Sequence, residues 1–135
     1  MEYVRTAAPV MVQLFGPDEA AHLLHLTGKL IGMQYFDEIA TSFSAGKGDT
    51  EAFAAFLQAL FEEQGDRTEM EKSGGTFELR QQTWTLMSDV ADYHPACASV
   101  LNGLCEGLAA GCGRHISVAM RAGKTGAPPF VWSIG

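Results

Sequence analysis

The spacing of apolar residues changes along this chain, and this change limits the available folds more than any other feature. Over residues 17–43 and 49–65 apolar side chains recur at the spacing of an α-helix. Over residues 67–73 and 76–82 they alternate with polar side chains, and a glycine pair separates the two segments. The sequence therefore predicts two helices followed by a β-hairpin, and the first helix, which is apolar on most sides, is predicted to be largely buried.

A second succession of helix and strands fills the rest of the chain. A third helix is predicted to begin at Pro95 and to bury one apolar stripe, and the segments 114–121 and 129–134 alternate again. Four short strands with one apolar face each favour an antiparallel sheet with helices packed on one face, which is an α+β fold. For residues 1–16 we expect either an arm or an extra strand.

Size and charge restrict the class of protein further. The 135 residues suit a single domain with its own core. Nine Lys and Arg residues, spread along the chain, oppose sixteen Asp and Glu residues, and the net charge of −7 disfavours a nucleic-acid partner. No apolar run approaches the roughly 18 residues of a membrane span, and we expect no signal peptide. An odd number of cysteines, three, indicates free thiols and a cytoplasmic location.

The last fifty residues carry a series of short motifs. The series is Trp84, His94-Pro95-Ala96-Cys97, Asn102-Gly103, Glu106-Gly107, Gly113-Arg114, Arg121 at a strand end, and Gly126-Ala127-Pro128-Pro129-Phe130-Val131-Trp132-Ser133-Ile134. Residues 84–134 thereby resemble the C-terminal half of the 4-vinyl reductase-type domain, also called the hydrocarbon-binding domain, which is related in fold to vesicle-tethering subunits. The first eighty residues match only in the order of elements. The resemblance implies a domain that encloses a small apolar molecule, and it implies a homodimer.

The cysteines from which some members of that family build a zinc site are mostly replaced here. Family members usually carry one cysteine just after the residue that matches Arg121 and another at position 130, where this chain has Ala122 and Phe130. Only Cys97 of that set remains, and we expect no metal and no other cofactor. A related group with a similar closing motif hydrolyses a thiazoline carboxylic acid, which implies an enzymatic alternative with Cys97 and His94 as candidate catalytic residues.

The cysteines of the third helix fall on its apolar stripe. Cys97 and Cys112 are separated by roughly 20 Å at 1.5 Å per residue, so these two and Cys105 cannot share one ion. Buried apolar cysteine is the simpler interpretation. Cys97 keeps a functional alternative because a helix N-terminus lowers the pKa of a thiol, with His94 as its base, while Asp92 is expected to cap the helix.

Two histidines lie on one face of the first predicted helix. His22 and His25, three residues apart, could present two imidazoles to a metal. Lys29 continues this face, and a cation there favours a solvated surface over a metal site.

Glycines recur every four residues on the third predicted helix. Glycine costs a helix about 1 kcal/mol relative to alanine, so something must approach Gly103 and Gly107 closely. The alternatives are tight packing against Gly28 and Gly32 of the first predicted helix, or room for a ligand.

The predicted ligand site combines aromatic and polar side chains. Its candidate residues are Trp84, Tyr93, Cys97, Arg121 and Trp132. Ligand cavities are largely apolar and aromatic, but so are protein cores, and Arg121 fits either an acidic ligand or a plain surface position. We predict a non-catalytic domain that encloses a small apolar or mixed apolar and acidic molecule, as a sensor or a carrier. The alternatives are the hydrolase described above and a protein–protein interaction subunit.

Overall fold

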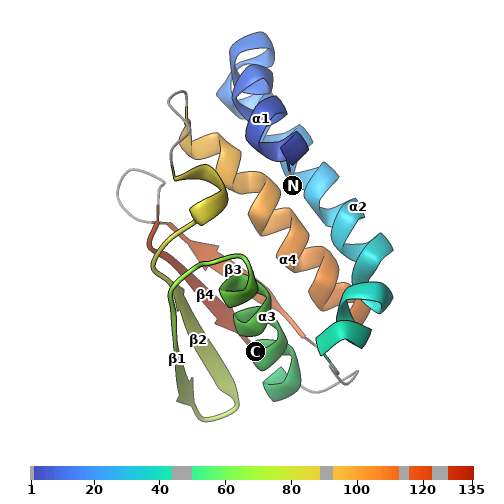
Figure 1. Cartoon of the computed structure of the whole chain (residues 1–135), viewed down its shortest axis with the longest axis vertical. Helices are drawn as coiled ribbons and strands as arrows, with labels where there is room; N and C mark the ends of the chain where they lie inside the picture. The colour runs from blue at the N-terminus through green and yellow to red at the C-terminus, as the bar shows by residue number, and fades with distance from the viewer. Residues whose placement is uncertain (1, 44–49, 89–92, 113–115, 123–127) are drawn as a thin grey trace.

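The computed structural model describes residues 2–43, 50–88, 93–112, 116–122 and 128–135. Its elements, in chain order, are α1 (Glu2–Phe15), α2 (Pro17–Phe43), α3 (Thr50–Glu63), β1 (Thr68–Ser73), β2 (Thr76–Gln81), the short 3-10 turns η1 (Thr85–Met87) and η2 (Pro95–Cys97), α4 (Ala98–Cys112), β3 (Val118–Arg121) and β4 (Phe130–Ile134) (Figure 1). The predicted α+β fold is confirmed, and the helices and the hairpin begin and end close to the predicted residues.

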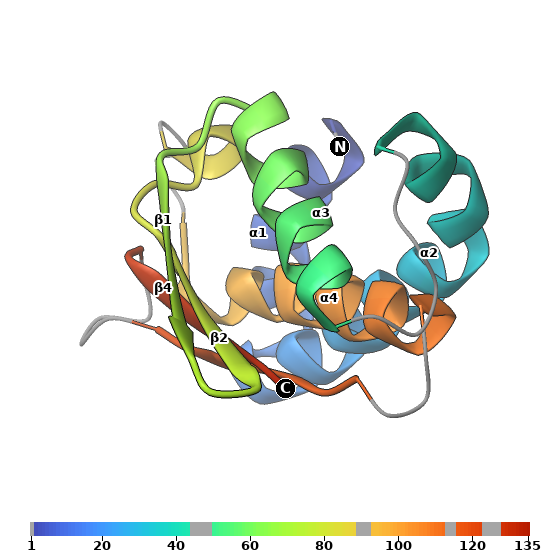
Figure 2. The same cartoon turned by 90° about the horizontal axis from the view of Figure 1, so that it is seen from below.

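The strands form one antiparallel sheet in the order β1-β2-β4-β3. The described helices all lie on one side of this sheet (Figure 2). Inward-facing side chains alternate with outward-facing ones along each strand, and β4 shows this most clearly, because Phe130, Trp132 and Ile134 are buried while Ser133 is exposed. The predicted inward face of the third strand segment is also confirmed, since Ile116 is buried and both Ser117 and Ala119 are exposed.

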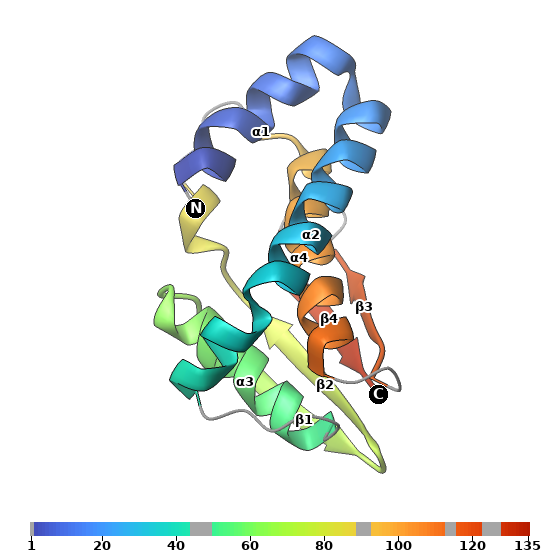
Figure 3. The same cartoon turned by 90° about the vertical axis from the view of Figure 1, so that its right-hand side faces the viewer.

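Two helices cover the inner face of the sheet, and a third lies outside them. α3 packs against β1 and β2, α4 packs against β3, and α2 runs along the side of α4 in the most extensive helix contact of the fold (Figure 3). The core between these layers holds Phe53, Leu57, Phe61, Leu79 and Trp132.

The contact between α2 and α4 depends on glycines. A Cβ added to Gly103 would overlap the carbonyl oxygen of His25, and one added to Gly28 would overlap the carbonyl oxygen of Val100. Gly107 of α4 is equally close to the backbone of α2. The glycine stripe therefore serves tight helix packing, which was the simpler of the two interpretations, and leaves no room for a ligand there.

Residues 2–15 form a helix, so the expectation of an arm or an extra strand at residues 1–16 is wrong for the part that the structure describes. The cluster Val10-Met11-Val12 after Pro9 favours a strand locally. Tertiary packing overrides that preference, because Ala8 is fully buried and Met11 packs against the core one turn further on. Gly16, with φ of +83°, then ends the helix.

The outer face of α2 differs from the largely buried helix that the sequence predicts. Leu26, Leu30 and Met33 expose 45%, 65% and 53% of their surface. His25 and Lys29, predicted to lie on the solvated side, flank the glycine contact with α4 instead, and Nε2 of His25 lies 2.8 Å from a carboxylate oxygen of Glu106. The glycines, rather than the largest apolar residues, determine which face of α2 is buried.

Candidate functional site

A pocket of about 300 Å³ opens beside the end of β2, and it contains two of the predicted ligand-binding residues. Its lining residues are Gln82, Thr83, Trp84, Met87, Ser88, Tyr93 and Pro128. They come from the segment that joins β2 to η1, from the start of η2, and from the approach to β4. None of these lining side chains is a charged type, and most of the wall is apolar.

Two aromatic rings form the deep part of this pocket. The ring of Tyr93 meets that of Trp84 edge to face, with centroids 6.2 Å apart and an interplanar angle of 84°. Trp84 is 3% exposed and also packs edge to face on Phe130, at 5.9 Å. Edge-to-face pairs of this kind hold rings in fixed orientations, so the pocket wall is rigid at Trp84.

A buried carboxylate fixes the segment that carries Trp84. Gly65, with φ of +93°, ends α3 and turns the chain so that Asp66 is buried. The backbone N–H of Thr85 donates to Oδ1 of Asp66 at 2.7 Å, and the side-chain amide of Gln81 donates to Oδ2 at 2.9 Å. Gln81 before Trp84 and Thr85 after it therefore both donate to the same buried carboxylate, which holds the segment in place.

The phenol of Tyr93 stays neutral throughout the physiological pH range. Its pKa is raised from 10.0 to about 12, mainly by burial and in smaller part by the charge that the nearby Cys97 would carry as a thiolate. The hydroxyl group is therefore present as a hydrogen-bond donor and acceptor beside the pocket, and it brings no charge.

Cys97 lies behind Tyr93 and is completely buried. Burial raises the pKa of its thiol, and this effect exceeds the lowering by the backbone N–H groups of His94 and Cys97 itself. At neutral pH the thiol is protonated, so the position at a helix N-terminus does not by itself make Cys97 a nucleophile.

His94 acts as a helix cap. Its Nδ1 accepts a hydrogen bond from the backbone N–H of Ala96 at 2.9 Å, which makes His94 the N-cap of η2, where the sequence predicted Asp92. Asp92 lies outside the described residues. An imidazole that accepts at Nδ1 carries its proton on Nε2 when neutral, so neither nitrogen is set up to remove a proton from Cys97.

The remaining two predicted ligand residues lie elsewhere. Trp132 is completely buried in the core and does not line the pocket: its ring packs on Phe61 with centroids 5.8 Å apart, and its indole N–H donates to Gln81. Arg121 is exposed at the end of β3 and is not among the residues that line the pocket. The structure therefore brings Trp84 and Tyr93 together at the pocket. Cys97 is near Tyr93 but does not line the pocket, and Trp132 and Arg121 do not line it either.

Sequence reasoning missed several lining residues. Met87 and Ser88 follow Trp84 closely, and Pro128 belongs to the closing motif. The sequence did contain a signal for these residues. Trp84, Leu86 and Met87 are apolar, follow the hairpin directly and do not alternate as a strand does, so they can cover the end of the sheet.

No metal centre is found within the described residues, because no three of their His, Cys, Asp or Glu side chains converge. Cys105, like Cys97, is a buried free thiol, and burial raises its pKa well above the ordinary value. Cys112 is not described at the side-chain level, and the absence of zinc stays a prediction.

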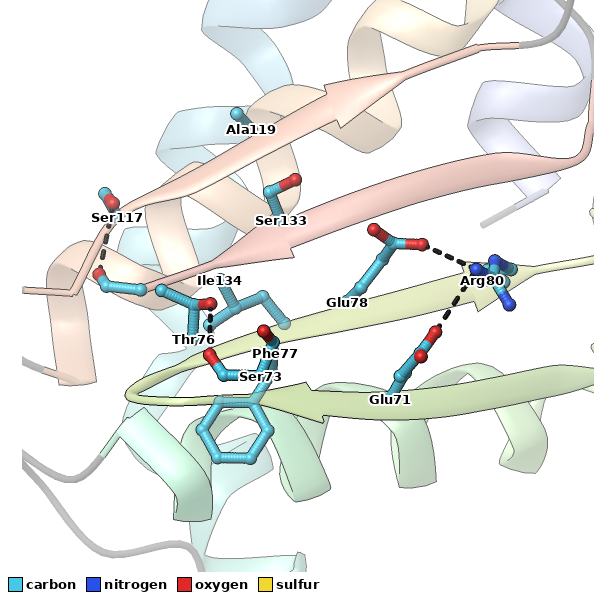
Figure 4. Close-up of a pocket in the computed structure, with 11 residues that line it drawn as sticks. Glu71, Ser73, Thr76, Phe77, Glu78, Arg80, Ser117, Ala119, Ser133 and Ile134 are labelled. Atoms are coloured by element: carbon cyan, nitrogen blue, oxygen red, sulfur yellow. Dashed lines mark hydrogen bonds and ion pairs between the residues drawn. The ribbon is translucent and has the colours of Figure 1, made fainter.

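The open face of the sheet has a second hollow, of about 580 Å³ (Figure 4). Arg80 stands at one end of it, 2.9 Å from a carboxylate oxygen of Glu78 and 3.3 Å from one of Glu71. Small side chains, among them Ser117, Ala119 and Ser133, form the remaining floor. Arg80 is already neutralised by its neighbours, so this surface has no unpaired cation for an acidic ligand.

Comparisons with known proteins assign no family and no relative to this chain. The chain matches no model of a known protein family, and it has no significant match among curated proteins. The resemblance of residues 84–134 to the 4-vinyl reductase-type domain therefore stays a prediction. Among the described helices, none combines the length and the apolar character that crossing a membrane requires.

Proposed function

We propose that this chain is a non-catalytic binding domain that holds a small, neutral, ring-containing molecule in the pocket lined by Trp84 and Tyr93. The observation that carries the proposal is the pocket itself, a hollow of about 300 Å³ with a rigid aromatic base and no charged side chain among its lining residues. Apolar pockets with a few well-placed polar groups are the usual form of a small-molecule site.

The volume of the pocket limits the size of the ligand. At roughly 30 Å³ for each atom or small group in a condensed phase, 300 Å³ accommodates about ten non-hydrogen atoms. A single ring with substituents or two fused rings fit this limit.

The polar groups at the pocket favour a neutral ligand with one or two hydrogen-bonding atoms. Oγ1 of Thr83 accepts from the backbone N–H of Arg67 at 3.1 Å, so the hydroxyl proton of Thr83 remains to be donated. The side-chain amide of Gln82 adds a further donor and acceptor. A ligand carboxylate would lose its hydration in this pocket without meeting a cation. The free energy of that desolvation exceeds what hydrogen bonds to neutral groups provide.

The same geometry favours binding over hydrolysis. A reaction through Cys97 and His94 needs a thiolate and an imidazole able to accept its proton, whereas burial keeps the thiol protonated and Ala96 occupies Nδ1 of His94. A thiazoline carboxylate would in addition bring a negative charge to a lining without cations. Buried free thiols at Cys97 and Cys105 are also consistent with the reducing cytoplasm in which we place the protein.

Native mass spectrometry of protein purified from its own host tests this proposal. We expect a retained molecule of low mass that is lost from a Ser88→Trp variant, because the exposed Ser88 lines the pocket and an indole there fills it. A Gln64→Trp variant, also at an exposed position but at the end of α3, is the control and should keep the molecule. A molecule retained equally by both variants would place the binding site elsewhere.

A further inference from the structure

The two edges of the sheet differ in their protection against pairing with another strand. β1 presents charged residues along its length, among them Glu69, Glu71 and Lys72, and charge of this kind blocks edge pairing. β3, the other edge, reads Val-Ala-Met-Arg, and only Arg121 at its end is charged. β3 is therefore an edge without the usual charged protection.

The hydrogen bonds of β3 to β4 define which of its backbone groups point outward. Ser117 and Gly135 exchange both of their backbone hydrogen bonds, at 2.9 and 3.0 Å. Hydrogen-bonded and non-hydrogen-bonded pairs alternate along antiparallel strands, so Ala119, opposite Ser133, is the next residue bonded to β4. The N–H and C=O groups of Val118 and Met120 consequently point away from β4, toward the open edge.

A hollow of about 380 Å³ runs beside this edge on the inner side of the sheet. Val118 and Ile116 border it from the strand side, Ala109 and Glu106 from α4, and Lys29 from α2. The space shows that the described helices do not cover the edge of β3. Lys29 and Glu106 both line the hollow, so this edge carries charges of both signs rather than a single sign that would repel a second copy.

We propose that a second copy of this chain adds its own β3 to this edge, antiparallel, and that the two sheets join into one of eight strands. The register that uses the outward groups of both Val118 and Met120 within β3 places each Val118 opposite the Met120 of the other copy. The twofold axis then passes beside Ala119, which faces Ala119 of the second copy.

This register is compatible with every side chain along the joined edge. Facing residues in a non-hydrogen-bonded pair lie about 4.5 Å apart at their Cα atoms, and the methyl groups of two alanines fit that separation. Arg121 faces Ser117 of the other copy, so no like charges meet. Ser117, Ala119 and Ser133 are small and leave the open face of the sheet flat near the axis (Figure 4). An edge that is complementary to itself in this way favours a second copy over an unrelated peptide.

The proposal is tested by sedimentation velocity over a concentration series, with Ala119→Glu as the main variant. Two glutamates would face each other across the axis, and we expect the dimer dissociation constant to rise about tenfold or more. Ser73→Glu is the matched control, because it adds the same charge at an exposed position on the opposite edge strand. This control should dimerise like the unmodified chain.

A second variant separates the edge from the fold. Met120→Pro removes an N–H that points outward and spares the bonds to β4, so circular dichroism should show an unchanged fold while the dimer is lost. A monomer for the unmodified chain at all concentrations would overturn the proposal. So would a dimer that Leu30→Glu abolishes and Ala119→Glu leaves intact, because that result would assign the interface to the exposed apolar residues of α2.

Discussion

The indole N–H of Trp132 donates to Oε1 of Gln81 at 3.0 Å, and both side chains are completely buried. The amide group of Gln81 then donates to Asp66, which also accepts from the backbone of Thr85. This line of hydrogen bonds connects β4, β2, the end of α3 and the segment that carries Trp84. Buried polar groups satisfied in this way hold a single arrangement of the elements around them.

We expect Gln81→Met to lower the free energy of unfolding by about 2–4 kcal/mol, because the buried indole N–H of Trp132 loses its acceptor and Oδ2 of Asp66 loses the amide donor, while Oδ1 of Asp66 keeps the bond from Thr85. Urea denaturation measures the change. Gln64→Met, at an exposed position, should stay within about 0.5 kcal/mol of the unmodified chain. Combining Gln81→Met with Trp132→Phe should recover part of the loss, and strict additivity of the two changes would argue against the hydrogen bond.

The role of Trp132 shows where sequence reasoning reaches its limit. Its place on an alternating strand with an inward face follows from the sequence and is confirmed. Whether an inward-facing tryptophan lines a pocket or fills the core depends on what stands opposite. Here Phe61 and Gln81 come from other elements, and one sequence does not pair them with Trp132.

The sequence predicted the contact between two helices correctly but not how much of α2 is buried. The glycines on both helices correctly indicated a close contact between α2 and α4. The burial of α2 was overestimated. Large apolar residues occur on most sides of this helix, but only the side that carries the glycines packs against α4. Leu30 is consequently exposed.

Gly103→Ala tests that contact. The added methyl group would overlap the backbone of α2 at His25, which cannot move independently, so we expect a loss of about 3 kcal/mol or more in the free energy of unfolding, or failure to fold. Gly75→Ala is the control, because nothing lies within 4 Å of the added methyl group. Thermal melting of the two variants should differ by many degrees, and equal melting temperatures would contradict the close packing.

Alkylation tests the state of the buried thiols. Cys97 and Cys105 have raised pKa values because of burial, so iodoacetamide at neutral pH should leave both largely unmodified in the folded chain. Peptide mapping before and after denaturation in urea provides the comparison. Rapid labelling of Cys97 that a small carboxylic acid blocks would support the hydrolase in place of the binding domain.

Tyr93 should make the stability of the fold depend on pH in the alkaline range. Its pKa is raised from 10.0 to about 12 in the folded chain, so the folded state keeps a proton that the unfolded state releases. The contribution of this group is complete below pH 10 and is lost as the pH rises toward 12. Replacing Tyr93 with phenylalanine should remove this part of the decline, and absorbance titration should lose one late-ionising phenol among the three tyrosines. A phenol with an ordinary pKa would show that Tyr93 is not buried as described.

The chain contains two tryptophans, one at the pocket and one in the core, and this provides the most direct test of the proposed function. Protein labelled with ¹⁵N shows one indole resonance for Trp84 and one for Trp132, assigned through the Trp84→Phe and Trp132→Phe variants. On titration with unlabelled indole, a neutral two-ring probe of suitable size, we predict a saturable shift of the Trp84 resonance with a dissociation constant in the low-millimolar range or tighter, and no shift of Trp132. An unresponsive Trp84 resonance, or equal shifts of both, would contradict a binding pocket lined by Trp84 and Tyr93.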